Sequence, residues 1–154
     1  MVTGVASCAA PPQQSEQATR DSTQEQQEQN ERALLEYVDA ERATIPLVLE
    51  QYPGLYSEAL VSSSHFESRG DRGVPEGTYS VVTFSYDYAT AVDWTAAQAA
   101  LDTKRSAIDE LCDTAVFPAM RDAGVTGYLG VVYSYKDARD IGPLWEHSCW
   151  ESSF

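Results

Sequence analysis

The sequence predicts an α+β domain in which two helices cover one face of a four-stranded antiparallel sheet. Two periodicities lead to this fold class. Apolar residues recur every three or four positions over 33–52 and 94–123, as in amphipathic helices. Apolar and polar residues alternate over 77–89 and 125–136, as in strands with two different faces. With further strands expected over 55–66 and 143–151, the order is helix–strand–strand–helix–strand–strand.

The first helix has an apolar stripe with one charged member, Glu41. The other members are apolar or aromatic: Leu34, Val38, Ile45, Val48 and Tyr52. Because Pro46 has no backbone donor, we expect a kink or a short break near residues 44–45. The Pro-Gly pair at 53–54 ends the element.

The second helix follows the strongest strand, in which Val82, Phe84, Tyr86 and Tyr88 share one face. It begins near a capping-box pattern over 95–98, and Pro118 should kink its last turns. A polar turn at 136–140 then joins the last two strands as a β-hairpin.

The first 32 residues predict a lipid anchor and a stalk. In residues 1–8, the run Val5-Ala6-Ser7-Cys8 resembles a bacterial lipobox, whose cysteine is lipidated and becomes the mature N-terminus. The basic and apolar segments of a signal peptide are missing before it, so we expect the true start to lie upstream. Residues 9–32 contain seven Gln and four Glu and no Val, Ile, Leu, Met or aromatic residue. Such a segment cannot bury a core, and we expect a solvated tether, part of it an exposed helix. The folded domain is then 33–154.

Charge and hydropathy exclude several partners. The chain carries a net charge of −14, which repels nucleic-acid backbones and anionic lipid headgroups. It has no apolar run long enough to span a bilayer. Membrane attachment should therefore be covalent, through Cys8, with no nucleic-acid partner.

The two remaining cysteines form an even pair in an exported protein, and we predict a disulfide between Cys112 and Cys149. It would place Trp145 and His147 on the helix-facing side of the last strand and Trp150 on the other. Two buried free thiols are the alternative. A metal site is not expected, because the two histidines lack clustered ligand spacing. No motif for a cofactor is present.

The residues suggest three candidate functions. A sheet covered on one side leaves the other face open, where Tyr79, Val81, Tyr128 and Val132 would offer an aromatic strip to a protein or envelope component. The polar loop 67–77 contains Arg69-Gly70-Asp71 and could serve an inhibitor or adhesin. A hydrolase would have to use His65 or His147, although no nucleophile–base–acid pattern accompanies them.

Three runs of the chain resemble a known family: Ala33–Arg42 in the first helix, Thr83–Tyr88 in the strong strand, and Asp122–Thr126 before the last hairpin. They look like domain of unknown function 4854, a family of small lipoprotein domains of Gram-positive bacteria. The likeness covers about residues 31–136, and the end with Trp145, Cys149 and Trp150 departs from it. The resemblance implies a secreted or lipid-anchored location and assigns no catalytic residue or ligand. We therefore expect a non-enzymatic binding domain, without a cofactor, on the outer face of a Gram-positive cell membrane.

Overall fold

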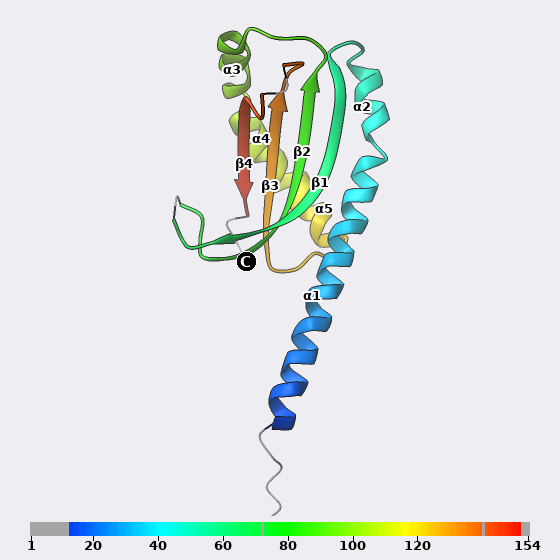
Figure 1. The fold of residues 1–154 in the computed structure, drawn as a ribbon, viewed down its shortest axis with the longest axis vertical. Helices are drawn as coiled ribbons and strands as arrows, with labels where there is room; N and C mark the ends of the chain where they lie inside the picture. Colours follow the sequence, from blue (N-terminus) through cyan, green and yellow to red (C-terminus); the bar gives the residue numbers. More distant parts are fainter. Residues whose placement is uncertain (1–12, 72, 140, 152–154) are drawn as a thin grey trace, which may run out of the picture.

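The computed structural model describes residues 13–71, 73–139 and 141–151, with the backbone alone for 13–21. Cys8 and the lipobox-like run lie outside the described residues. The elements follow in the order α1 (Gln13–Arg42), α2 (Ile45–Gln51), β1 (Tyr56–Ser68), β2 (Gly77–Tyr88), α3 (Trp94–Asp102), α4 (Arg105–Leu111), the π-helix η1 (Cys112–Val116), α5 (Phe117–Asp122), β3 (Tyr128–Lys136) and β4 (Trp145–Trp150). The molecule is an α+β domain with a four-stranded sheet, as predicted (Figure 1).

The sheet is mixed, so the prediction of an all-antiparallel sheet is wrong for its central pair. The strand order is β1-β2-β3-β4. The outer pairs β1/β2 and β3/β4 are antiparallel, whereas β2 and β3 run parallel, with Val82 opposite Val131. The reason lies in the connection: α3, α4, η1 and α5 return the chain along the sheet before β3 begins. A helical crossover of this kind joins parallel strands, while a tight turn joins antiparallel ones.

The helices pack on one face of the sheet and form the core with it. From α1 the core takes Leu34, Tyr37 and Val38, and from the end of the crossover it takes Phe117 and Met120. The sheet contributes the alternate residues of each strand, among them Val61, Val82, Phe84, Leu129, Val131, Tyr133 and Cys149. We call the other side of the sheet the open face.

Both predicted helices are interrupted. The first ends at Arg42 and resumes at Ile45, where Pro46 occupies the first turn of α2, so the expected break near residues 44–45 is confirmed. The backbone of α1 reaches back to Gln13, through much of the predicted stalk. The second helix stops at Asp102 and resumes at Arg105. It then widens into the π turn η1, which ends at Val116, two residues before Pro118. Because Pro118 has no N–H, the regular α-helical hydrogen-bond ladder cannot continue through it, and a π turn is one way to absorb the mismatch.

Side chains from the helices bind the backbone of both outer strands. The Nε of Arg42 donates to the carbonyl of Val61 in β1 at 2.9 Å. At the other edge, Gln98 donates to the carbonyl of Leu144 at 3.0 Å, and Arg105 to that of Glu146 in β4 at 3.3 Å. These contacts occupy backbone groups that an edge strand would otherwise offer to another chain.

Within the described residues, no helix is both long enough and apolar enough to cross a membrane.

Candidate functional site

The main candidate site is a line of aromatic side chains that crosses the helix-facing side of the sheet. We call it the aromatic row, and its members are Tyr52, Tyr56, Tyr86, Tyr88, Tyr135 and Trp145. Each ring contacts the next: the centroids lie 6.2 Å apart for Tyr52 and Tyr56, 5.3 Å for Tyr56 and Tyr86, 5.1 Å for Tyr86 and Tyr135, and 5.6 Å for Tyr135 and Trp145. Tyr88 joins Tyr56 and Tyr135 at 5.4 and 5.9 Å. The row therefore connects β1, β2, β3 and β4.

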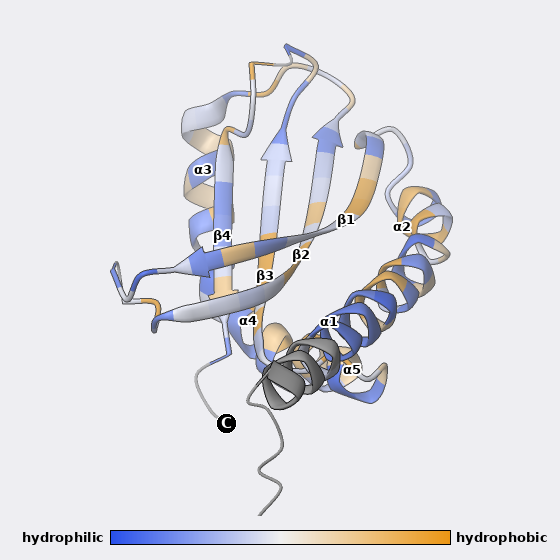
Figure 2. Ribbon diagram, turned by 60° about the horizontal axis from the view of Figure 1, so that its bottom comes forward, coloured by the Kyte–Doolittle hydropathy of each residue, from blue (hydrophilic) through white to orange (hydrophobic). Residues whose placement is uncertain are grey.

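The aromatic row lies at the end of the molecule farthest from Gln13. The chain enters the body at the bottom of Figure 1, whereas α2 and the carboxyl ends of β2 and β3 lie at the top. Four rings of the row are partly exposed, and Tyr52 is 47% exposed. The helix that precedes Tyr52, α2, is mostly apolar (Figure 2). Its Leu47 is 65% exposed, and Leu55 after it is 43% exposed. Aromatic and aliphatic side chains that remain exposed together are typical of binding surfaces.

Burial raises the pKa of four tyrosines of the aromatic row. It raises the pKa of Tyr56 to about 12, with smaller contributions from the neighbouring tyrosines. Burial likewise raises the pKa of Tyr135, Tyr86 and Tyr88 above the ordinary tyrosine value. At neutral pH these residues therefore present neutral rings with hydroxyls that can donate and accept hydrogen bonds.

The strip expected on the open face is placed there by the structure, but half of it is covered. Tyr79 and Val81 are 0% and 3% exposed, whereas Tyr128 and Val132 are partly exposed. The ring of Tyr79 packs against those of Phe66, Tyr128 and Trp150, and its hydroxyl donates to the carbonyl of Pro75 at 3.1 Å. Neither Tyr79 nor Val81 is therefore available to touch a partner in this conformation.

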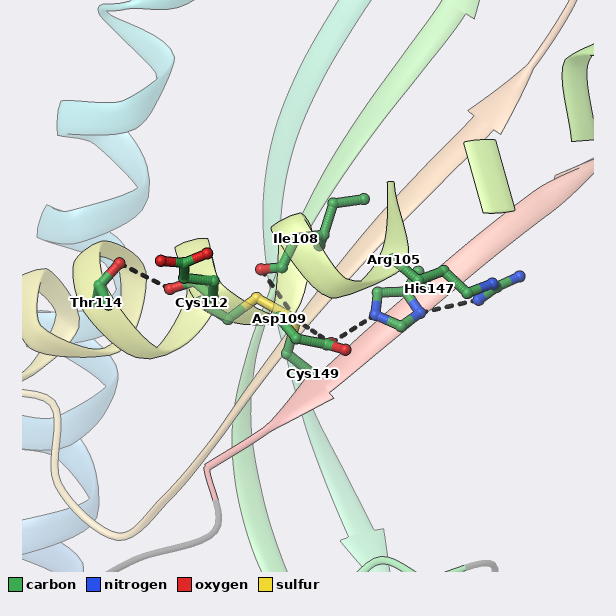
Figure 3. Close-up of a disulfide and its surroundings, with 8 residues drawn as sticks. Arg105, Ile108, Asp109, Cys112, Thr114, His147 and Cys149 are labelled. Atoms are coloured by element: carbon green, nitrogen blue, oxygen red, sulfur yellow. Dashed lines mark hydrogen bonds and ion pairs between the residues drawn. A yellow bond between two sulfur atoms is a disulfide. The ribbon is translucent and has the colours of Figure 1, made fainter. Parts of the chain in front are cut away.

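The structure brings Cys112 and Cys149 to disulfide distance. Their sulfur atoms lie 2.18 Å apart and their Cα atoms 6.4 Å apart, between the start of η1 and β4 (Figure 3). Trp145 and Cys149 belong to the core, and Trp150 lies against Phe66 and Tyr79 on the open face. The pair is buried, with Cys112 0% and Cys149 6% exposed.

His147 lies beside this pair, between two charged residues of α4 (Figure 3). Its Nδ1 is 2.8 Å from Nη1 of Arg105, and its Nε2 is 2.6 Å from Oδ1 of Asp109. Because arginine always donates, Nδ1 must accept, and Nε2 carries the hydrogen given to Asp109. A histidine that activates a nucleophile needs one ring nitrogen free for it. In this arrangement both nitrogens of His147 are engaged.

The same place holds the group of donor atoms best suited to a metal. The donor atoms of Asp109, His147 and Cys149 all lie within 4.8 Å of one another. With its sulfur in a disulfide, however, Cys149 cannot supply the thiolate that binds metals. Two protein donors then remain, fewer than the three or four of an ordinary zinc site.

His65 lies at the other end of the sheet and lines a polar cavity of about 420 Å³. The cavity lies between α1 and the ends of the strands, and its wall includes Gln26, Asn30, Thr78, Ser80 and Thr126. Asn30 joins α1 to β2 and to the loop before β3. Its Nδ2 donates to the hydroxyl of Ser80 at 3.1 Å, and its Oδ1 accepts from the backbone N–H of Thr126 at 2.6 Å. His65 itself is exposed, and no acid–histidine pair is formed by it among the described residues.

The loop between β1 and β2 shares this end of the sheet. Arg69 and Asp71 are exposed, and Gly70 between them has a φ of +79°. The hydroxyl of Ser68 accepts from the N–H of Gly70 and donates to the carbonyl of Val74, which fixes the turn. The loop is thus displayed, but at the end of the strands opposite the aromatic row.

Two contributors to these sites, Arg105 and Asp109, were not predicted from the sequence. Both lie on α4, and their distance from His147 along the chain hides the contact. The helical periodicity alone could place Asp109 and Cys112 on adjacent turns, but not opposite β4.

In comparisons with known proteins, no family model, no curated protein and no solved structure matches this chain.

Proposed function

We propose that this protein is a lipid-anchored binding domain on the outer face of a Gram-positive cell membrane, and that it contacts a protein or envelope component through the aromatic row. It acts by binding, without a catalytic centre or cofactor. The observation that carries the proposal is the position of the row, which is partly exposed and lies at the end of the body farthest from Gln13.

The long first helix supports this arrangement. Residues 22–29 of α1 are exposed, and Gln26 is the first of them to line the cavity beside the sheet, so the helix before it extends beyond the body (Figure 1). An α-helix rises 1.5 Å per residue, so residues 13–25 correspond to a spacer of about 20 Å. If lipid is attached to Cys8, the spacer holds the body off the membrane and turns the aromatic row outward.

The proposed location at the cell membrane is inferred from the sequence. The Val5-Ala6-Ser7-Cys8 run and the Gln- and Glu-rich segment after it favour a lipoprotein, and membership in domain of unknown function 4854 is proposed on the three runs of similar sequence. The test is to express the gene with its upstream region in a Gram-positive host and label it with a fatty-acid probe. We expect Cys8→Ala to abolish labelling and to release the protein into the medium. Unchanged membrane retention of the variant would refute the anchor.

The binding surface is tested with purified protein and isolated envelopes of the organism that carries the gene. Leu47→Ser and Tyr52→Ser alter exposed side chains at the aromatic row and should weaken retention on the envelopes. Leu60→Ser and Phe66→Ser are matched controls, because these residues are 52% and 40% exposed on the open face. The surface is wrongly assigned if the two pairs of variants lose binding equally.

A further inference from the structure

Four side chains that carry metal-binding atoms meet between the crossover helices and the last strand (Figure 3). Asp109 comes from α4, Cys112 from the start of η1, and His147 and Cys149 from β4. The two helical residues are three positions apart, so they share a side of the helix. The two strand residues are two positions apart, so they share a face of the sheet. Each element therefore presents a pair of donor groups to the other.

The donor atoms are close enough to share one ion. Those of Asp109, His147 and Cys149 all lie within 4.8 Å of one another. From Oδ1 of Asp109, Nε2 of His147 is 2.6 Å away and Sγ of Cys149 is 3.7 Å away. The sulfur of Cys112 is bonded to that of Cys149, and the Cα atoms of the two cysteines are 6.4 Å apart. Zinc takes these donors at about 2.0–2.3 Å, so the donors around one tetrahedral ion lie about 3.3–3.8 Å apart.

The oxidation state of the cysteines decides whether the set of donors is complete. In the disulfide form, Asp109 and His147 alone can donate, which is too few for a zinc site. A dithiol reductant opens the disulfide by exchange: the cysteine pair gains two electrons and two protons, and the reductant becomes a disulfide. The set then holds two sulfurs, one imidazole nitrogen and one carboxylate oxygen, a combination that favours zinc over the oxygen-seeking magnesium and calcium. Zinc displaces the two thiol protons, because the thiolate is the ligand.

Burial distinguishes this group from an ordinary cluster of surface acids. Cys112 and Cys149 are 0% and 6% exposed, and the side chain of His147 is 13% exposed. The side chain of Asp109 is 54% exposed, so it leaves a route from solvent to the sulfurs. Two thiolates and a carboxylate carry three negative charges, which the ion and the neighbouring guanidinium of Arg105 offset.

Arg105 has to turn aside when the ion binds. Its Nη1 donates to Nδ1 of His147 at 2.8 Å, so Nε2 carries the ring hydrogen in the disulfide form. Zinc on Nε2 moves that hydrogen to Nδ1, where it opposes the guanidinium. Arg105 keeps its other partner, Asp102, whose Oδ1 is 2.8 Å from Nη2. The position of the ring hydrogen is therefore a signature of the bound metal.

We propose that the reduced form of this protein binds a zinc ion through Asp109, Cys112, His147 and Cys149. The ion replaces the disulfide as the link between η1 and β4, so the body keeps this cross-link when its cysteines are reduced. The proposal goes beyond the proposed function and does not depend on it, since it gives zinc no part in binding the partner.

The test titrates zinc into the full chain carrying Cys8→Ser, in which Cys112 and Cys149 are the remaining cysteines. One sample keeps its disulfide. The other is reduced with dithiothreitol and freed of it by gel filtration without oxygen. In competition with a chromophoric chelator, we expect the reduced chain to take up about one equivalent of zinc. It should bind at least about a hundredfold more tightly than the disulfide form, since even the outer partners of metal ligands contribute 10–100-fold.

Variants of the reduced chain test the two ligands that are not cysteines. Asp109→Asn and His147→Gln should each weaken zinc binding by more than about tenfold. Glu110→Gln and His65→Gln are matched controls, because they remove the same kinds of group from exposed positions, and they should stay within about twofold of the parent. Nitrogen NMR of His147 should show the ring hydrogen on Nε2 in the disulfide form and on Nδ1 in the zinc form.

Reduction also removes a cross-link, so the fold of the reduced chain is followed by near-ultraviolet circular dichroism. A reduced chain that unfolds should refold with zinc, because the free energy of metal binding then becomes free energy of folding. Equal zinc affinity in the two oxidation states overturns the site. It is overturned as well by equal losses in the ligand and control variants, or by a reduced chain that stays unfolded in excess zinc.

Discussion

The indole of Trp150 occupies the space in which a side chain at Gly130 would stand. The two residues are paired across β3 and β4. A Cβ atom at position 130 would lie 2.5 Å from Cζ3 of Trp150 and 3.2 Å from Cγ2 of Val81. Gly130 is thus required by the indole, which in turn closes the small aromatic cluster over Tyr79 on the open face.

Gly130→Ala should therefore destabilise the domain by about 1–3 kcal/mol, the usual cost of overpacking a core. Trp150→Leu makes room at this site, so Gly130→Ala should cost less in that background. Urea unfolding of the four proteins in a double-mutant cycle measures the coupling. Additive effects would show that the indole does not enforce the glycine.

Removal of the disulfide should lower the free energy of unfolding. Cys112 and Cys149 are 37 positions apart in the sequence, and closing such a loop is worth about 3–4 kcal/mol by the chain-entropy estimate. Cys149→Ala should show this loss in non-reducing urea unfolding, and a reductant should have little further effect on the variant. Quantitative alkylation of both cysteines in the natively exported protein would contradict the bond.

Protonation of Asp137 should lower the stability of the domain at acid pH. Its side chain is fully buried, and the guanidinium of Arg139, the N–H of Val92 and the indole of Trp94 hold its pKa well below the usual value. A lowered pKa in the folded state gives stability that is present above about pH 4, the unfolded pKa, and is lost as the pH falls further. Asp137→Asn should be less stable at pH 7 and should lose less stability between pH 4 and pH 2 than the wild type. Parallel curves of unfolding midpoint against pH would contradict this role.

The tyrosines should make the domain less stable as the pH rises in the alkaline range, whereas Asp137 acts as the pH falls in the acid range. The pKa of Tyr56 is raised from 10.0 to about 12, mainly by burial. Its contribution to stability is therefore complete below about pH 10 and is lost as the pH rises toward 12. Tyrosine absorbance at 295 nm should show Tyr56 ionising late in the folded protein, and Tyr56→Phe should flatten the decline of stability above pH 10. A wild type that titrates as free tyrosine would contradict the burial of the row.

The local sequence pattern was enough to predict where most helices and strands lie. The alternation of Val82, Phe84 and Tyr86 predicted β2 over 77–89, and the structure has it at Gly77–Tyr88. Pro46 correctly marked the break between α1 and α2. These features depend on neighbours in the chain, which periodicity and proline chemistry describe well.

The direction of strand pairing and the burial of the open face were harder to predict, because they depend on residues far apart in the sequence. The strand pattern of Val125–Lys136 does not say whether β3 runs with or against β2. The length of the helical connection before β3 does, because a crossover of this length joins parallel strands. Likewise, alternation put Tyr79 and Val81 on the open face correctly but could not show that Phe66 and Trp150 cover that region.

The claim that the aromatic row is the binding surface is tested most directly by photo-crosslinking on living cells. A photoreactive amino acid is placed at position 52 in the row, or at position 60 on the open face, in the otherwise native protein. Both positions are about half exposed, so the reagent reaches solvent equally in each. The account predicts a discrete crosslinked product from position 52 and none above background from position 60. A product from position 60 with none from position 52 would contradict it.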